Sequence, residues 1–111
     1  MAASYRNIAL LATPLLVLGS RVRIFSIHVE NSNATKSYLQ LYNAAAAADV
    51  TVGTTTPDKT LFVPPNGAMD FDWAQDTVKY GNGLVVAATT TADGSTAPGT
   101  GLLINLDYER M

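Results

Sequence analysis

The chain contains no cysteine, one histidine and one tryptophan, and only 14% of its 111 residues are charged. Without cysteine these residues form no disulfide and no thiolate metal site, so the fold must be stabilised by packing or by partners. The 7 basic and 9 acidic side chains are scattered, whereas a nucleic-acid surface needs a basic stripe. Charged residues usually make up about a quarter of a globular chain, so the low content indicates that neighbouring molecules cover part of the surface.

Long hydrophobic runs are also missing. The longest apolar stretch, Ile8 to Gly19, is interrupted by Pro14 and is too short for a bilayer crossing of about 20 residues, so no membrane partner is predicted. Its composition is similar to that of a signal-peptide core, which stays as an alternative. We interpret the stretch as the end of an apolar N-terminal arm, residues 1–13, followed by a folded domain at residues 14–111.

The rest of the chain is a series of short apolar or alternating runs separated by Gly, Pro, Asn, Asp and Thr. These runs predict strands at residues 15–18, 21–30, 36–43, 60–63, 68–73, 84–90 and 102–108. The first two are predicted to form a hairpin through Gly19 and Ser20. Together, about seven or eight strands predict an all-β fold, a single antiparallel β-sandwich of jelly-roll-like form.

Three local details add to this prediction. Within residues 21–30 the apolar residues occupy one face up to Ile24 and the other from Phe25 onward, which predicts a β-bulge or a strand covered on both sides. The five alanines at residues 44–48 are too few for a stable helix and predict a compact loop or a single turn. Trp73, the lone tryptophan, is predicted to lie at the centre of the core.

The single histidine, His28, has one candidate partner close in sequence, Glu30, on the same strand face. A general base or metal ligand needs a carboxylate or a second ligand oriented on it, so a structural or exposed histidine is the simpler interpretation. No serine of the chain lies in a Gly-x-Ser-x-Gly elbow. We therefore predict no catalytic residues, no cofactor and no enzymatic activity.

Three acidic residues, Asp70, Asp72 and Asp76, begin like a calcium loop. The positions that require Gly and Glu, however, hold Gln75 and Gly81. Alternation of the first two aspartates with apolar residues is typical of a strand with one solvent-exposed face. We predict a strand here and no metal site, with calcium binding as the alternative.

The arm carries Tyr5, Ile8, Leu10 and Leu11 and only one charged residue, Arg6. Such a segment has little reason to stay in water, so it either adds to its own core or inserts into a partner. We predict that it docks on a neighbouring subunit as an added strand. The four apolar residues are therefore the predicted assembly contacts.

Five segments follow one another in a characteristic order: SYLQLYN (37–43), TVGTTTP (51–57), PPNG (64–67), GNGLVVAATTT (81–91) and GLLINLDY (101–108). In order and spacing they resemble a group of small virion proteins of tailed bacteriophages. The resemblance runs from residue 15 to residue 108 and includes no catalytic motif.

The resemblance implies a compact, non-enzymatic β-sandwich located in the virion. A capsid decoration or cement protein is the first expectation, with further copies of the chain as a homo-oligomer, for example a trimer, and the major capsid protein as partners. The alternative is a neck, tail or fibre accessory module that binds host-surface glycans through threonine, asparagine and tyrosine side chains. Tyr80, beside Gly81, is the candidate aromatic platform for such a ligand. An enzyme is a third class, for which no convergent acid, base and nucleophile can be named.

Overall fold

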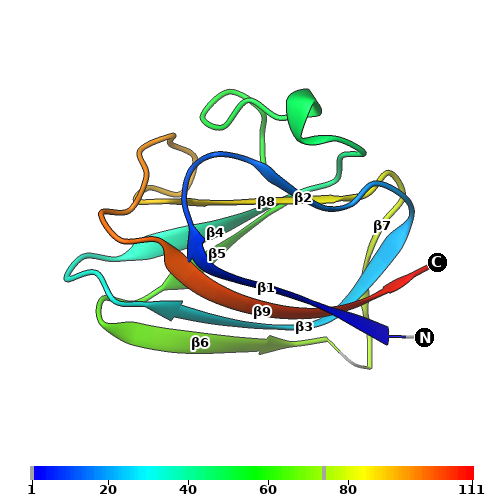
Figure 1. Cartoon of the computed structure of the whole chain (residues 1–111), viewed down its shortest axis with the longest axis horizontal. Coiled ribbons are helices and arrows are strands. Elements are labelled where there is room, and N and C mark those ends of the chain that lie inside the picture. Colours follow the sequence, from blue (N-terminus) through cyan, green and yellow to red (C-terminus); the bar gives the residue numbers. More distant parts are fainter. Residues whose placement is uncertain (1, 74) are drawn as a thin grey trace.

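The computed structural model describes residues 2–73 and 75–111, which form two antiparallel sheets packed face to face (Figure 1). The predicted all-β sandwich is confirmed. The described strands are β1 (Ala2–Leu10), β2 (Leu15–Leu18), β3 (Val22–Asn31), β4 (Ser37–Tyr42), β5 (Lys59–Val63), β6 (Gly67–Asp72), β7 (Val78–Tyr80), β8 (Leu84–Thr89) and β9 (Leu102–Arg110). The run of alanines gives one short 3-10 turn, η1 (Ala47–Asp49), as its length predicts.

The order of the strands is that of a jelly roll. The first sheet has the order β1-β9-β3-β6, with β7 also paired to β3, and the second has the order β2-β8-β4-β5. β6 pairs with residues 26–31 of β3 and β7 with residues 22–24, so β7 continues the line of β6. With β6 and β7 counted as one interrupted strand, the topology is that of the eight-stranded double sheet. Most connections cross between the sheets, so neither sheet is complete without the other.

The predicted hairpin between the second and third strands is wrong. β2 pairs with β8 in the second sheet, with Leu16 opposite Val85. β3 pairs with β6, β7 and β9 in the first sheet. The connection through Gly19 and Ser20 therefore carries the chain from one sheet to the other. A short turn between two apolar runs has the same pattern in both cases, because each strand buries its apolar face against the opposite sheet.

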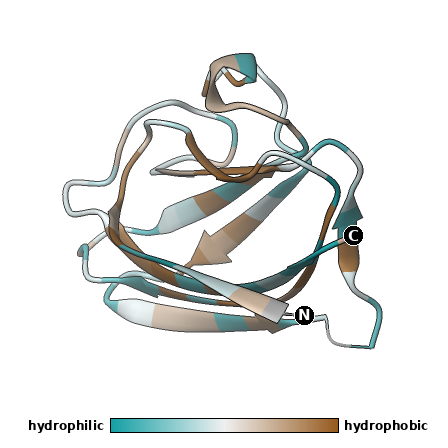
Figure 2. Cartoon of the chain, turned by 45° about the vertical axis from the view of Figure 1, so that its right-hand side comes forward, coloured by the Kyte–Doolittle hydropathy of each residue, from teal (hydrophilic) through white to brown (hydrophobic). Residues whose placement is uncertain are grey.

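The core lies between the sheets and is built by alternate residues of the inner strands. In β4 both Leu39 and Leu41 are fully buried, and in β9 Leu102, Ile104 and Leu106 are buried while the residues between them are more exposed. The alternation is visible as bands of colour along the strands in Figure 2. These inner faces are the ones that the period-two pattern predicts.

The change of face in β3 is a β-bulge at Phe25. Ile24 lies opposite Tyr108 and Ser26 opposite Asp107, so Phe25 is an extra residue relative to β9. The extra residue returns the apolar positions on either side of it to the same inner face. The four buried residues are Val22, Ile24, Ile27 and Val29. The sequence predicts either a β-bulge or a strand covered on both sides, and the structure confirms the β-bulge.

Trp73 is not the central core residue that the sequence predicts. It follows the last residue of β6, is half-buried, and stacks on Phe71 with ring centroids 6.0 Å apart. Its backbone N–H donates to the carbonyl of Phe25 at 2.7 Å, so it lies where the bulge of β3 separates β6 from β7. The alternation placed Trp73 on the apolar side correctly, but it could not show that the strand ends at Asp72.

Loops of the chain itself cover part of the outer face of the second sheet. Tyr42, Ala44 and Val50 form a small second core with Val85 and Ala87 of β8. β8 is therefore buried along its whole length, which confirms the inner strand predicted from its continuous apolar run.

A buried polar network holds the loop between β8 and β9, residues 90–101, over the outer face of the second sheet. The Gln40 side-chain nitrogen donates to Thr89 Oγ1 at 3.0 Å and to the carbonyl of Ala92 at 2.9 Å. The Tyr42 hydroxyl donates to the Gln40 side-chain oxygen. Both ends of the buried amide are thus satisfied, as a polar group in a core requires.

Candidate functional site

The segment predicted as an arm is a strand of the sandwich. Residues 2–10 form β1 at one edge of the first sheet and pair with β9, with Tyr5 opposite Leu106 and Leu10 opposite Leu102 (Figure 1). The predicted division at residue 13 is therefore corrected, because residues 2–10 complete a sheet of their own chain.

The four predicted assembly contacts divide into two pairs. Leu10 is fully buried and stabilises its own chain, so the prediction for it is corrected, while Tyr5 is half-buried and packs against the core. Ile8 is 65% exposed and Leu11 is 41% exposed, so these two remain accessible to a partner.

A register shift in β1 explains the division. Asn7 lies opposite Ile104, whereas Leu10, three residues on, lies opposite Leu102. The extra residue turns Leu10 into the core and leaves Ile8 outside. Gly101 permits the close approach of the strands here, since a Cβ on it would lie 2.5 Å from a backbone carbon of Ala9. The shift depends on the far end of the chain and has no signature within residues 1–13.

The outer edge of β1 pairs with no strand in the part of the chain that the structure describes. Along residues 2–8 alternate residues present backbone N–H and C=O groups at this edge that a further strand can bind. The N–H of Ala9 already donates to Asn7 Oδ1 at 2.8 Å. The strand contains one charged side chain, Arg6, and no proline. It therefore has little of the protection that usually prevents edge strands from pairing with other chains.

Beside this edge, the outer face of the first sheet is polar. Asp107 on β9 accepts hydrogen bonds from Ser4 Oγ on β1 at 2.9 Å and from Ser26 Oγ on β3 at 3.1 Å. At one end of the face the Arg23 guanidinium forms an ion pair with Glu109. Side-chain contacts thus connect β1, β9 and β3 across the outer face.

His28 lies on the same face between two carboxylates. Its Nδ1 lies 2.6 Å from an oxygen of Asp70, and its Nε2 lies 2.8 Å from an oxygen of Glu30. The hydrogen bonds to Glu30 and then to Asp70 raise the pKa of His28 above its usual 6.5. Both ring nitrogens are engaged on an exposed sheet surface, so the imidazole is better placed to connect strands than to accept a proton from a substrate.

The sequence identified Glu30 as a partner of His28 but missed Asp70. The register of β3 and β6 places His28 opposite Asp70, and Asp72 opposite Ser26. The strand with a solvent-exposed face that the aspartates predict is confirmed by the burial pattern of β6. Within residues 2–73 and 75–111 no group of three acidic, histidine or cysteine side chains is arranged to hold a metal ion.

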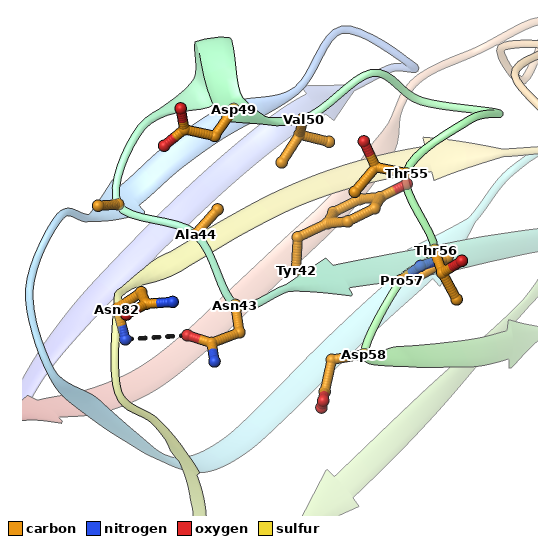
Figure 3. Close-up of a pocket in the computed structure, with 11 residues that line it drawn as sticks. Tyr42, Asn43, Ala44, Asp49, Val50, Thr55, Thr56, Pro57, Asp58 and Asn82 are labelled. Carbon is orange, nitrogen blue, oxygen red and sulfur yellow. Dashed lines mark hydrogen bonds between the residues drawn. The ribbon is translucent and has the colours of Figure 1, made fainter.

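An open hollow of about 490 Å³ lies under the loop of residues 43–58. Its polar lining includes Asn43, Asp49 and Asp58, and Asn43 Oδ1 accepts the backbone N–H of Asn82 at 2.9 Å. In Figure 3 the ring of Tyr42 points toward Thr55, which also lines the hollow. That ring is 2% exposed and so offers little surface for a ligand to stack on.

Tyr80 is not the exposed aromatic platform that a glycan-binding alternative requires. It is 3% exposed and packs in the main core. Burial, with the Asp58 carboxylate beside it, raises the pKa of Tyr80. The phenol therefore remains protonated and closes one end of the sandwich.

None of the helical structure in the described residues has the length and hydropathy of a membrane span. No protein-family model matches the chain, and no curated protein matches it. One similar solved structure comes from work titled "Bacillus endospore appendages form a novel family of disulfide-linked pili". It is 14% identical, with a TM-score of 0.46, and the similarity covers 100% of this chain and 86% of that chain. We infer no function from a similarity of this size.

Proposed function

We propose that this chain is a non-enzymatic structural protein of a bacteriophage virion, a capsid decoration or cement protein that binds the shell and its own neighbours. The observation that carries the proposal is the open edge of β1, with the exposed Ile8 on it and the exposed Leu11 directly after it. The resemblance of residues 15–108 to small phage virion proteins supports it. A jelly roll is also a framework that viral capsid proteins use.

Of the five large apolar side chains that the described residues expose, three lie along one side of the sandwich, whereas Phe62 is on β5 and Met111 follows β9. Ile8 is on β1, Leu16 is 44% exposed on β2, and Leu11 lies in the connection between these two strands. Each contributes about 1 to 2 kcal/mol when a partner covers it. Hydrogen bonds from the β1 backbone would also fix the orientation of a partner strand at this apolar contact. The side formed by β1 and β2 is therefore the surface that we assign to assembly.

The proposal is tested by the copy number of this chain in purified virions of the phage that encodes it, measured by quantitative mass spectrometry. A decoration protein is expected in numbers comparable to those of the major capsid protein. A few copies per particle would contradict decoration and favour the neck or tail. Absence from washed particles would overturn the virion proposal as a whole.

A second candidate function is a tail or fibre module that binds host-surface glycans. The hollow under residues 43–58 favours it, because amide, hydroxyl and carboxylate groups such as those of Asn43, Thr55 and Asp49 line it. Sugar hydroxyls bind groups of this kind. A glycan array distinguishes the candidates: saturable binding that Asp49→Ala abolishes supports the glycan module, and no binding leaves decoration as the proposal.

A further inference from the structure

β1 is the longest and least protected of the strands at the edges of the two sheets. β2 has four residues, β5 has five, and the line formed by the other two strands is interrupted, since β6 ends at Asp72 and β7 begins at Val78. Prolines also flank the shorter edges, with Pro14 before β2 and Pro64 after β5. Proline cannot donate a backbone hydrogen bond, so it limits pairing at those edges. β1 has no such limit.

The side chains at the middle of β1 distinguish two central registers for pairing with a second copy of the same strand. In an antiparallel pair, opposite residues project to the same face, so a two-fold axis must pass through a residue. An axis at Arg6 would place two guanidinium groups opposite each other, which is unfavourable. An axis at Tyr5 places Arg6 of one copy opposite Ser4 of the other.

This register brings opposite charges onto the same face. Ser4 lies opposite Asp107 on β9 and donates to its carboxylate. Arg6 of the second copy would therefore face Asp107 across one intervening strand, about 10 Å from backbone to backbone. An arginine and an aspartate side chain together span this distance. Arg6 forms no ion pair with any other residue that the structure describes, so it is available for this contact.

We propose that a second copy of this chain pairs antiparallel with the open edge of β1 about a two-fold axis at Tyr5, so that Arg6 of each copy binds Asp107 of the other. The two five-stranded sheets then form one continuous sheet. The contact is isologous and closes as a dimer. It deepens the proposed function, on which it rests for its role, because it supplies the binding between neighbours that decoration requires.

The test uses charge reversal in the full chain, followed by sedimentation velocity and native mass spectrometry. The wild-type protein is expected to be dimeric at about 100 μM. Arg6→Glu places a glutamate of one copy beside Asp107 of the other, and Asp107→Lys places a lysine beside Arg6. Each variant is expected to weaken the dimer about tenfold or more. Lys79→Glu on β7, at the opposite margin of the same sheet, makes the same change of charge and is expected to leave the dimer intact.

A mixture of the two variants makes the test specific. In a heterodimer of Arg6→Glu with Asp107→Lys, one contact has reversed charges and the other is native, so the mixture is expected to dimerise although neither variant does alone. If the lysine variant fails to fold, Asp107→Asn keeps an acceptor oxygen for one serine and offers an N–H donor to the hydroxyl oxygen of the other. It is expected to weaken the dimer of the otherwise unchanged chain.

A wild-type protein that is monomeric at this concentration, or trimeric, would overturn the inference. So would an Arg6→Glu variant that dimerises as well as the wild type, or a mixture that stays monomeric. These results are separate from the test of the proposed function. Virions that contain a chain monomeric in solution would overturn the dimer alone, whereas a dimer absent from virions would overturn the virion proposal alone.

Discussion

His28 is the residue whose charge connects two strands of the exposed face. Its ring nitrogens bind Glu30 and Asp70, while its neighbour on β9, Asn105, is neutral. The two carboxylates stabilise the imidazolium and raise the pKa of His28 in the folded state. The resulting stability is fully present below the unfolded pKa of about 6.5 and is lost as the pH rises through the higher folded pKa.

We expect a direct titration to show this shift. NMR of the ring protons is unambiguous, because the chain has one histidine, and it should give a pKa above 6.5 that falls in Glu30→Gln and in Asp70→Asn. Since the site is exposed to solvent, its contribution to the free energy of unfolding should stay below about 1 kcal/mol. An unshifted pKa, or one that neither variant lowers, would contradict the assigned contacts.

A second residue, Tyr42, tests the buried network of the outer loops. Its hydroxyl donates to the Gln40 amide, which is fully buried. Tyr42→Phe leaves an amide oxygen without its donor and is expected to lower the free energy of unfolding by about 1 to 2 kcal/mol. Tyr38→Phe on the same strand is the control, because the Tyr38 ring is only half-buried against Phe62. Chemical denaturation measures both, and equal effects would refute the role of the network.

The sequence predicted which side of a strand faces the core but not which residues meet across strands. Leu39 and Leu41 are buried as their alternation requires. Asp70 could not be assigned to His28, because the register of β3 and β6 follows from the packing of both sheets. Alternation is a local property of the chain, whereas register depends on residues that are far apart in sequence.

At the scale of elements, the strands that the sequence missed are those defined by their partners. β1 has a mixed pattern and was interpreted as an arm, yet β9 gives it a place in the sheet. β7 has three residues and exists as a strand because it continues the line of β6 along β3. Of the residues predicted as assembly contacts, Ile8 and Leu11 are exposed at the edge of β1, and their role in assembly stays a prediction.

The turn between β7 and β8 depends on one glycine. Gly83 has a φ of 152°, and a Cβ on it would lie 2.5 Å from the carbonyl oxygens of Ala44 and Leu18. Gly83→Ala is expected to destabilise the protein by about 2 kcal/mol or more, through strain and backbone clashes.

Gly81, two residues earlier, is the matched control for this prediction. A Cβ there would contact nothing within 4 Å. Gly81→Ala is therefore expected to change the free energy of unfolding by only about 0.5 kcal/mol. Thermal or urea unfolding compares the two variants, and a Gly83→Ala protein as stable as Gly81→Ala would show that the turn relaxes more easily than its contacts indicate.

At the scale of the molecule, the topology joins the two ends of the chain. Residue 2 lies opposite residue 109 in the pair formed by β1 and β9, and both ends of the chain lie on the same side in Figure 1. The proposed dimer would therefore place both termini of each copy near the joined edge. Sequence patterns predicted the two layers and one core, but the order of strands within each layer is a property of the complete chain.

This order predicts how the chain folds. β1 with β9, and β2 with β8, are pairs formed from distant parts of the sequence, and they must form together because most connections cross between the sheets. Closing such long loops before the contacts form slows folding, so we expect refolding in about milliseconds to seconds as one cooperative transition. Stopped-flow fluorescence can follow it through Trp73, whose ring stacks on that of Phe71 in the folded chain. Folding within microseconds, or a separate early transition of one sheet, would show that a sheet forms without the other, against the interleaved topology.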